Sequence, residues 1–95
     1  MTDVAEPAPV VVDRPERSRF EVLVGDEVAG RAFYTLDDGL IVFTHTEVDD
    51  RFGGRGLGGV LARGALDAAR ARGLRVRPDC PFIRSWIEKH PEYSP

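Results

Sequence analysis

The sequence predicts an α+β fold with layered α and β parts, in which an antiparallel β-meander precedes a glycine-rich segment and an α-β-α unit. Apolar and polar residues alternate before residue 50, as in strands, whereas apolar residues recur at intervals of three and four after residue 57, as in a helix. Between the two patterns, residues 53–59 contain five glycines. Because strand and helix patterns largely occupy separate parts of the chain, the α+β class follows.

The chain has 95 residues, of which 42% are hydrophobic and 31% charged, and this composition suits one small globular domain. Residues 1–17 contain three prolines and no sustained periodicity. We therefore expect most of this segment to be a flexible tail, with Val10 to Val12 able to add a short edge strand. Residues 18–95 are expected to form the domain.

Three strands are expected in the meander, over residues 19–24, 28–36 and 40–48. The turns between them are predicted at residues 25–27 and 37–39, where glycine and acidic residues interrupt the strand pattern. The third segment is rich in the β-branched and aromatic residues that favour strands. Consecutive strands joined by short turns pair antiparallel, so these three make a meander.

A helix is predicted over residues 57–72, because its apolar residues recur on one face. Gly73 suits the left-handed residue that ends a helix. Residues 74–77 follow as a short strand that can pair parallel to residues 40–48. A second helix is expected from Pro81, closed by Pro91. Its predicted apolar face consists of Phe82, Ile83, Trp86 and Ile87.

The charges are unevenly distributed. Residues 1–50 hold 4 Arg against 12 Asp or Glu, a balance of −8, whereas residues 51–95 hold 9 Arg or Lys against 4, a balance of +5. The glycine-rich segment lies in the basic half, as expected for a site that meets a polyanionic ligand. Nucleic acid is not expected as a partner, because the whole chain carries −3 and its basic residues do not alternate with aromatic ones.

Neither a membrane nor a metal is expected as a partner. No apolar run approaches the roughly 20 residues that span a bilayer, and no secretory leader pattern is present, so we expect a cytoplasmic protein. The single cysteine, Cys80, cannot form an intramolecular disulfide and makes no usual zinc site alone. Because small domains have marginal cores, a homodimer is possible.

The five glycines favour a phosphate cradle at a helix start, where unpaired N–H groups and the helix dipole attract anions. A Walker-type loop requires Lys and then Ser or Thr after its last glycine, but Val60 and Leu61 follow here. Gly54, Gly56 and Gly59 match the dinucleotide fingerprint GxGxxG. That fold needs more βα units than this chain holds, so a small nucleotide-binding protein is a remote alternative.

The meander, a short acidic turn and the run Gly54-Arg55-Gly56-Leu57-Gly58 at a helix start together resemble motif A of the GNAT superfamily of acyl-CoA-dependent N-acetyltransferases. The motif is usually written (Gln/Arg)-x-x-Gly-x-(Gly/Ala). Gly56 and Gly58 occupy its two small positions. Gly53 stands where the family usually has Gln or Arg, and Arg51 or Arg55 could supply the missing side chain.

Residues 19–95 resemble in particular the very short, single-domain GNAT-like proteins. The resemblance rests on four segments: His45 to Val48, the helix from Leu57 to Arg72, Asp79 to Phe82, and His90 to Tyr93. Such proteins resemble a GNAT core without the later strands that help to form an acceptor pocket. A non-catalytic acyl-CoA binding or sensing module is therefore an alternative to an active transferase.

The resemblance implies that acetyl-CoA is the acyl donor and that an amine is the acceptor. The backbone from Thr46 to Val48 would pair with the pantetheine arm, and the amides from Gly54 to Gly59 would hold the pyrophosphate. The implied binding residues are Thr46, Val48, Gly53, Gly54, Arg55, Gly56, Leu57, Gly58 and Gly59.

Three side chains are candidates for the chemistry. His45 and Glu47 share one face of their strand and could relay a proton in direct transfer. Cys80, ahead of the helix from Pro81, could accept the acetyl group, because a helix N-terminus favours a thiolate. Each has a structural alternative: Glu47 as a solvated acid, His45 as a hydrogen-bonded residue and Cys80 as a small buried hydrophobe.

Overall fold

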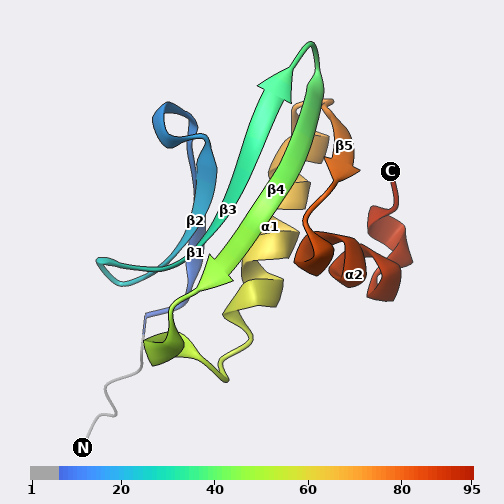
Figure 1. The fold of residues 1–95 in the computed structure, drawn as a ribbon. Helices are drawn as coiled ribbons and strands as arrows, with labels where there is room; N and C mark the ends of the chain where they lie inside the picture. Colours follow the sequence, from blue (N-terminus) through green and yellow to red (C-terminus); the bar gives the residue numbers. More distant parts are fainter. Residues whose placement is uncertain (1–6) are drawn as a thin grey trace, which may run out of the picture.

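Five strands form one mixed sheet across residues 7–95, the part of the chain that this computed structural model describes (Figure 1). The strand order is β1-β2-β3-β4-β5, antiparallel from β1 to β4 and parallel between β4 and β5. The strands are β1 (Val10–Arg14), β2 (Arg19–Val24), β3 (Glu27–Asp37), β4 (Leu40–Val48) and β5 (Arg75–Pro78). This arrangement confirms the predicted α+β class, the meander and the parallel strand pair.

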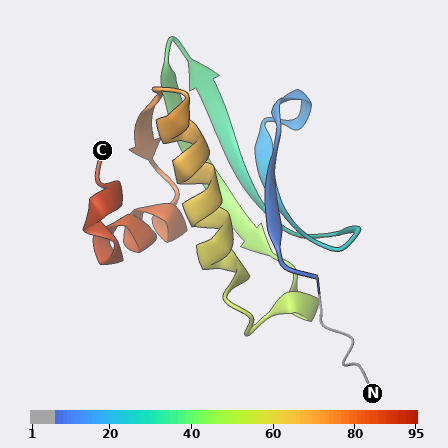
Figure 2. The same cartoon turned by 180° about the vertical axis from the view of Figure 1, so that it is seen from behind.

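Two α-helices lie on one side of the sheet (Figure 2). The first, α1 (Leu57–Ala71), runs along the sheet, and the second, α2 (Pro81–Lys89), packs beside β4, β5 and α1. Gly73, with a φ of 68°, follows the end of α1 as predicted. Short 3-10 helices are η1 (Pro15–Arg17), η2 (Asp50–Phe52) and η3 (Pro91–Tyr93). No helix within residues 7–95 is long and apolar enough to cross a bilayer.

The core lies between α1 and the sheet. Small residues on α1 let the helix approach the strands closely, and at Gly64 even one more carbon would not fit. A Cβ placed there would lie 2.6 Å from Cβ of Val11 on β1. The buried core includes Phe20, Val22, Ile41 and Phe43 from the sheet, Leu61, Ala65 and Ala69 from α1, and Ile83 and Trp86 from α2.

Two expectations differ from the structure. Residues 10–17, assigned mostly to a flexible tail, form β1 and η1, and the edge strand allowed for Val10 to Val12 is present. The tail assigned to residues 1–6 lies outside the described residues. Phe82, expected in the apolar face of α2, is 42% exposed, although its ring lies close to Gly58 on α1.

β4 contains a bulge that decides where it parts from β5. The adjacent residues Phe33 and Tyr34 on β3 face His45 and Phe43 on β4, so Thr44 is an extra residue on β4. A bulge bends its strand and increases the local twist. The pairing of β4 with β5 stops at Phe43, and no other described strand pairs with the rest of β4 on that side (Figure 1).

Candidate functional site

Beyond the bulge, the backbone of β4 has no strand partner among residues 7–95 on the side that faces β5. Residues 44–48 stay next to β3 on one side, but β5 pairs only with Leu40 to Phe43. The backbone N–H of Cys80 donates to the Phe43 carbonyl at 2.8 Å, and the chain then turns into α2. We call the β5-side backbone of residues 44–48 the open edge. It carries main-chain groups that can pair with an extended ligand.

Cys80 lies where β4 and α2 diverge, at the first end of the open edge. It is the N-cap residue of α2, as predicted, but its side chain makes no cap hydrogen bond. Instead its thiol donates to Oγ1 of Thr46 at 3.3 Å, and the residue is only 3% exposed. The structure thus brings two predicted site residues from distant parts of the sequence into contact.

Asp79, next to Cys80, is tied to the end of β5. The Arg77 guanidinium donates two hydrogen bonds of 2.9 Å to the two carboxylate oxygens of Asp79. These bonds hold the pKa of Asp79 below its ordinary value. The ion pair therefore joins the end of β5 to the residue that precedes Cys80.

His45 and Glu47 form a pair on the opposite face of β4. Nε2 of His45 lies 3.1 Å from Oε2 of Glu47, and both residues are exposed. The His45 ring also stacks on Phe33, and Arg31 contacts Glu47 at 3.5 Å. The predicted alternation is confirmed. It means that the histidine and carboxylate lie on one face, whereas the Thr46 side chain that contacts Cys80 belongs to the other.

The glycine loop ahead of α1 has two residues in the left-handed region. Gly54 and Gly56 have φ values of 80° and 70°. Gly56 is the N-cap of α1 and has no side chain to cap the helix. The first amides of α1 have no acceptor within the helix, and its first turn contains no acidic residue. The loop therefore presents N–H groups and the positive end of the helix dipole, which suit an anion.

The other glycines have different roles. A Cβ at Gly58 would lie 2.7 Å from Cζ of Phe82, and one at Gly59 would lie 3.4 Å from Nε1 of Trp86, so both permit close packing of α2 on α1. Gly53 has an ordinary φ of −62° and ψ of 150°. Phe82 was not predicted as part of the site. The sequence shows an aromatic residue two positions after Cys80, which was the available indication that it lies near the site. Only the fold places its ring over Gly58.

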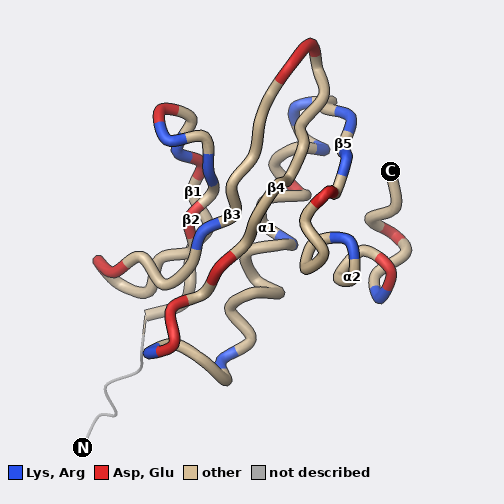
Figure 3. Tube along the Cα trace, in the orientation of Figure 1, with Lys and Arg blue, Asp and Glu red and all other residues tan. Residues whose placement is uncertain are grey.

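The segment that leads into the glycine loop is acidic and then basic, and a further basic residue lies within the loop (Figure 3). The guanidinium groups of Arg51 and Arg55 lie 5.1 and 5.3 Å from the ring centroid of Phe52, which is buried. Arg51 also contacts Glu27 at 3.1 Å. A guanidinium group beside helix amides that have no acceptor within α1 strengthens the attraction for a phosphate group. Within residues 7–95, no three His, Cys, Asp or Glu side chains gather as metal ligands would.

Comparisons with known proteins point to one family. A family model described as GCN5-related N-acetyl-transferase matches residues 19–95. Protein NATD1 of Bos taurus is 35% identical over 52 residues, which cover 55% of this chain and 46% of that protein. For Protein NATD1 of Homo sapiens the identity is 33% over 52 residues, with coverage of 55% and 46%. The chain thus spans about half the length of the curated relatives that it matches.

A solved structure extends the similarity over nearly the whole fold. It is the solution NMR structure of a GCN5-like N-acetyltransferase candidate from Staphylococcus aureus. The TM-score is 0.67 and the identity is 26%, and the superposition covers 88% of this chain and 82% of the other. The strand order and the position of α1 are therefore features of a known architecture.

Proposed function

This chain belongs to the GCN5-related N-acetyltransferase family, and on that basis we propose that it binds acetyl-CoA and transfers the acetyl group to an amine. The observation that carries this proposal is the open edge of β4. It begins at the Cys80–Thr46 contact and continues toward the segment that leads into the glycine loop and α1. An extended ligand with an anionic group at one end and a reactive group at the other fits that layout.

Each part of the ligand has a proposed place. The backbone of Thr46 and Val48 would pair with the amides of the pantetheine arm. The amides of the loop and the first turn of α1 would hold the pyrophosphate, helped by Arg55. The complete proposed set is Thr46, Val48, Gly53, Gly54, Arg55, Gly56, Leu57, Gly58 and Gly59.

Direct transfer is the first of two routes. The amine nitrogen attacks the thioester carbonyl, the C–S bond breaks, and CoA leaves as a thiolate that takes up a proton. The amine loses a proton in the same sequence. The exposed His45–Glu47 pair offers a proton acceptor to an amine that approaches the uncovered face of the sheet.

The second route passes through Cys80. Its Sγ attacks the thioester carbonyl, the bond to the CoA sulfur breaks, and the thiol proton passes to that sulfur. The amine then attacks the acetylated cysteine, and its proton restores the Cys80 thiol. Thr46 is the hydrogen-bond partner that orients Sγ. We propose Cys80, His45 and Glu47 as the catalytic residues, and the two routes differ in which of them is essential.

Binding without catalysis is the second candidate function. The burial of Cys80, which is 3% exposed, favours this function, because the thioester must be able to reach a nucleophile.

Mass spectrometry after incubation with labelled acetyl-CoA and a panel of amines separates the covalent route, direct transfer and binding alone. Label on Cys80 supports the covalent route. Acetylated amine with an unmodified thiol, unchanged in Cys80→Ala, supports direct transfer. Binding without any acetylated product supports a binding or sensing module.

The binding site is tested by calorimetry with Gly56→Ala and Gly39→Ala. Both glycines have positive φ, 70° and 78°, and neither has an atom within 4 Å of an added Cβ, so each variant carries similar backbone strain. We expect Gly56→Ala to weaken acetyl-CoA binding about tenfold, because the amides of the loop and of the first turn of α1 would turn away from the pyrophosphate. We expect Gly39→Ala to leave the binding unchanged. Equal effects, or tighter binding of NAD or ATP than of acetyl-CoA, would contradict the proposal.

A further inference from the structure

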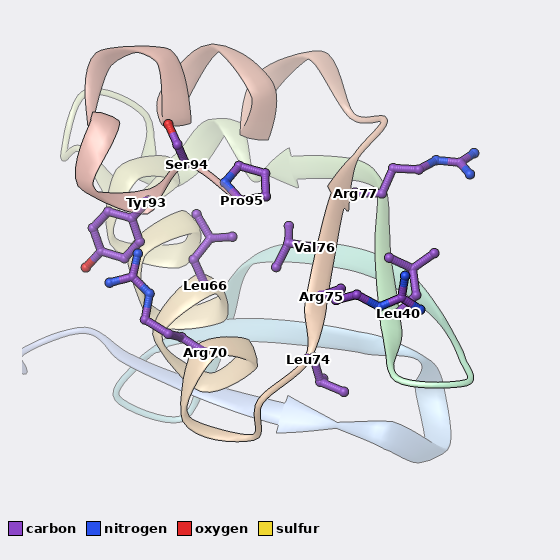
Figure 4. Close-up of a pocket in the computed structure, with 10 residues that line it drawn as sticks. All are labelled: Leu40, Leu66, Arg70, Leu74, Arg75, Val76, Arg77, Tyr93, Ser94 and Pro95. Atoms are coloured by element: carbon purple, nitrogen blue, oxygen red, sulfur yellow. The ribbon is translucent and has the colours of Figure 1, made fainter.

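A groove of about 690 Å³ lies beside β5, lined also by residues of α1 and of the C-terminal segment (Figure 4). Its apolar part includes Leu66 on α1, Val76 on β5 and Tyr93 in η3, together with Leu40, Leu74 and Pro95. Arg75 and Arg77 border it from β5. The volume lies in the range of protein ligand sites, and the apolar part is accompanied by a few charged groups, as such sites usually are.

β5 is the last strand of the sheet within residues 7–95, so its outer side has no strand partner there. The backbone N–H of Arg75 donates to the Gly39 carbonyl at 2.9 Å, toward β4. Because backbone groups alternate in direction along a strand, those of Val76 point to the outer side. An edge of this kind can pair with another extended chain.

The two faces of β5 differ in chemistry. Figure 4 shows Val76 on the side of Leu66 and Tyr93, whereas Arg75 and Arg77 extend from the other side of the strand. A chain added beside β5 would therefore meet apolar side chains on one face and guanidinium groups on the other. This alternation matches an extended segment in which apolar and acidic residues alternate.

The charge around the groove is not balanced locally. Arg75 donates to the Asp38 carbonyl at 3.4 Å, and Arg70, also in the lining, donates to the Glu92 carbonyl and stacks over Tyr93. Both partners are neutral main-chain groups. No Asp or Glu belongs to the described lining, and only Arg77 is paired with a carboxylate, that of Asp79.

We propose that the outer edge of β5 binds an extended acidic segment of a partner protein as an additional strand. Main-chain hydrogen bonds to Val76 would fix the segment, its apolar residues would enter the groove, and its carboxylates would face Arg75, which bonds only a neutral carbonyl among the described residues. A second copy of this chain fits less well. Two β5 edges paired antiparallel would place Arg75 of one copy opposite Arg77 of the other, and like charges in that position repel. The inference is independent of acetyl-CoA.

The test uses the full chain and a peptide of about seven alternating Val and Glu residues, the length of a short added strand. NMR titration follows the backbone amides, and we expect Val76 to gain protection from hydrogen exchange. Two further peptides carry N-methyl groups on all Val or on all Glu residues. Because alternate residues of a strand face opposite edges, only one of the two should bind.

Arg75→Glu and Lys89→Glu provide the matched protein variants, since each reverses one exposed cation and only Arg75 lines the groove. We expect Arg75→Glu to weaken binding of the Val-Glu peptide about tenfold and Lys89→Glu to leave it unchanged. A peptide in which Lys replaces Glu should not bind. The proposal is overturned by equal binding of both N-methylated peptides, by equal effects of the two variants, by absence of binding, or by a dimer formed through β5 that excludes the peptide.

Discussion

The glycines ahead of α1 differ in what they contribute. Gly54 and Gly56 adopt positive φ values, which residues with a side chain rarely adopt. These two glycines therefore determine the path of the loop. Gly53 adopts a conformation open to any residue, and its N–H donates to the Asp50 carbonyl at 3.0 Å. This chain departs from the GNAT motif at residue 53. The backbone there would accept the Gln or Arg that the motif usually has.

Gly53→Arg is expected to tighten acetyl-CoA binding. An added Cβ would lie 3.2 Å from the Asp50 carbonyl oxygen, which requires only a small adjustment. A guanidinium beside the proposed pyrophosphate site should gain about 0.5–1 kcal/mol, or roughly a two- to fivefold lower Kd. Calorimetry would measure the change.

The control for this substitution is Gly53→Ala, which adds the Cβ without the charge. We expect its Kd to equal that of the unmodified chain. If the arginine and alanine variants bind acetyl-CoA equally well, the pyrophosphate does not lie beside residue 53.

Among the elements, α1 is closely approached by α2 at Gly58 and by β1 at Gly64, and the two neighbouring side chains differ in how easily they can move. At Gly58 the nearest atom is the far end of the exposed Phe82 ring, which can rotate away. At Gly64 the nearest atoms belong to Val11, whose Cβ is fixed to the backbone of β1. The same added methyl group therefore has different consequences at the two positions.

Gly64→Ala is expected to destabilise the fold, and Gly58→Ala is not. The alanine Cβ at residue 64 would push β1 from α1 at a cost of about 1–3 kcal/mol, which a gain in helix propensity of up to about 1 kcal/mol offsets only in part, so we expect a net loss of about 1 kcal/mol. At residue 58 the ring moves, and the free energy of unfolding should stay within about 0.5 kcal/mol. Urea unfolding measures both variants, and equal stability would contradict the difference in stiffness.

The bulge in β4 is the element-scale feature that sets up the site. Thr44 is β-branched, like much of the strand around it, and nothing in the residue pattern distinguishes it as an extra residue. Register between strands depends on contacts with β3 and β5, which are distant in sequence. The open edge could therefore be expected from the GNAT resemblance, but not located from the pattern alone.

At the scale of the whole molecule, a buried carboxylate connects the first three elements. Glu21 on β2 is 1% exposed and contacts Arg14 of β1 at 3.1 Å, Arg17 of η1 at 3.5 Å and Arg19 at 2.6 Å. Burial acts to raise the pKa of Glu21, but the hydrogen bonds and charges of Arg19 and Arg14 outweigh it. The pKa is thus lowered from its ordinary value of 4.5.

Stability should therefore fall in acid through Glu21. A carboxyl whose folded-state pKa is lowered stabilises the fold above its unfolded pKa, and this contribution is lost as the pH falls through the folded value. We expect Glu21→Gln to lose about 1–3 kcal/mol near neutral pH and to show a flatter decline below about pH 4.5.

Thermal or urea unfolding as a function of pH measures this effect. Glu16→Gln is the matched control, because it makes the same chemical change at an exposed position of η1. Its pH profile should follow that of the unmodified chain. An identical acid limb in Glu21→Gln would show that the arginine cluster does not hold Glu21 ionised in the folded state.

The amino-acid pattern alone was enough to predict the α+β class, the meander, the parallel pair, both helices, and the glycine loop at the start of α1. These follow from local causes: side-chain periodicity, turn residues, and the restriction of positive φ largely to glycine. The contact of Cys80 with Thr46 and the position of the Phe82 ring over Gly58 became visible only in the folded structure. The tertiary structure also decided that β5 presents an unpaired edge beside a groove. Such contacts join residues far apart in the chain, and their geometry depends on strand register and helix packing, which no single segment specifies.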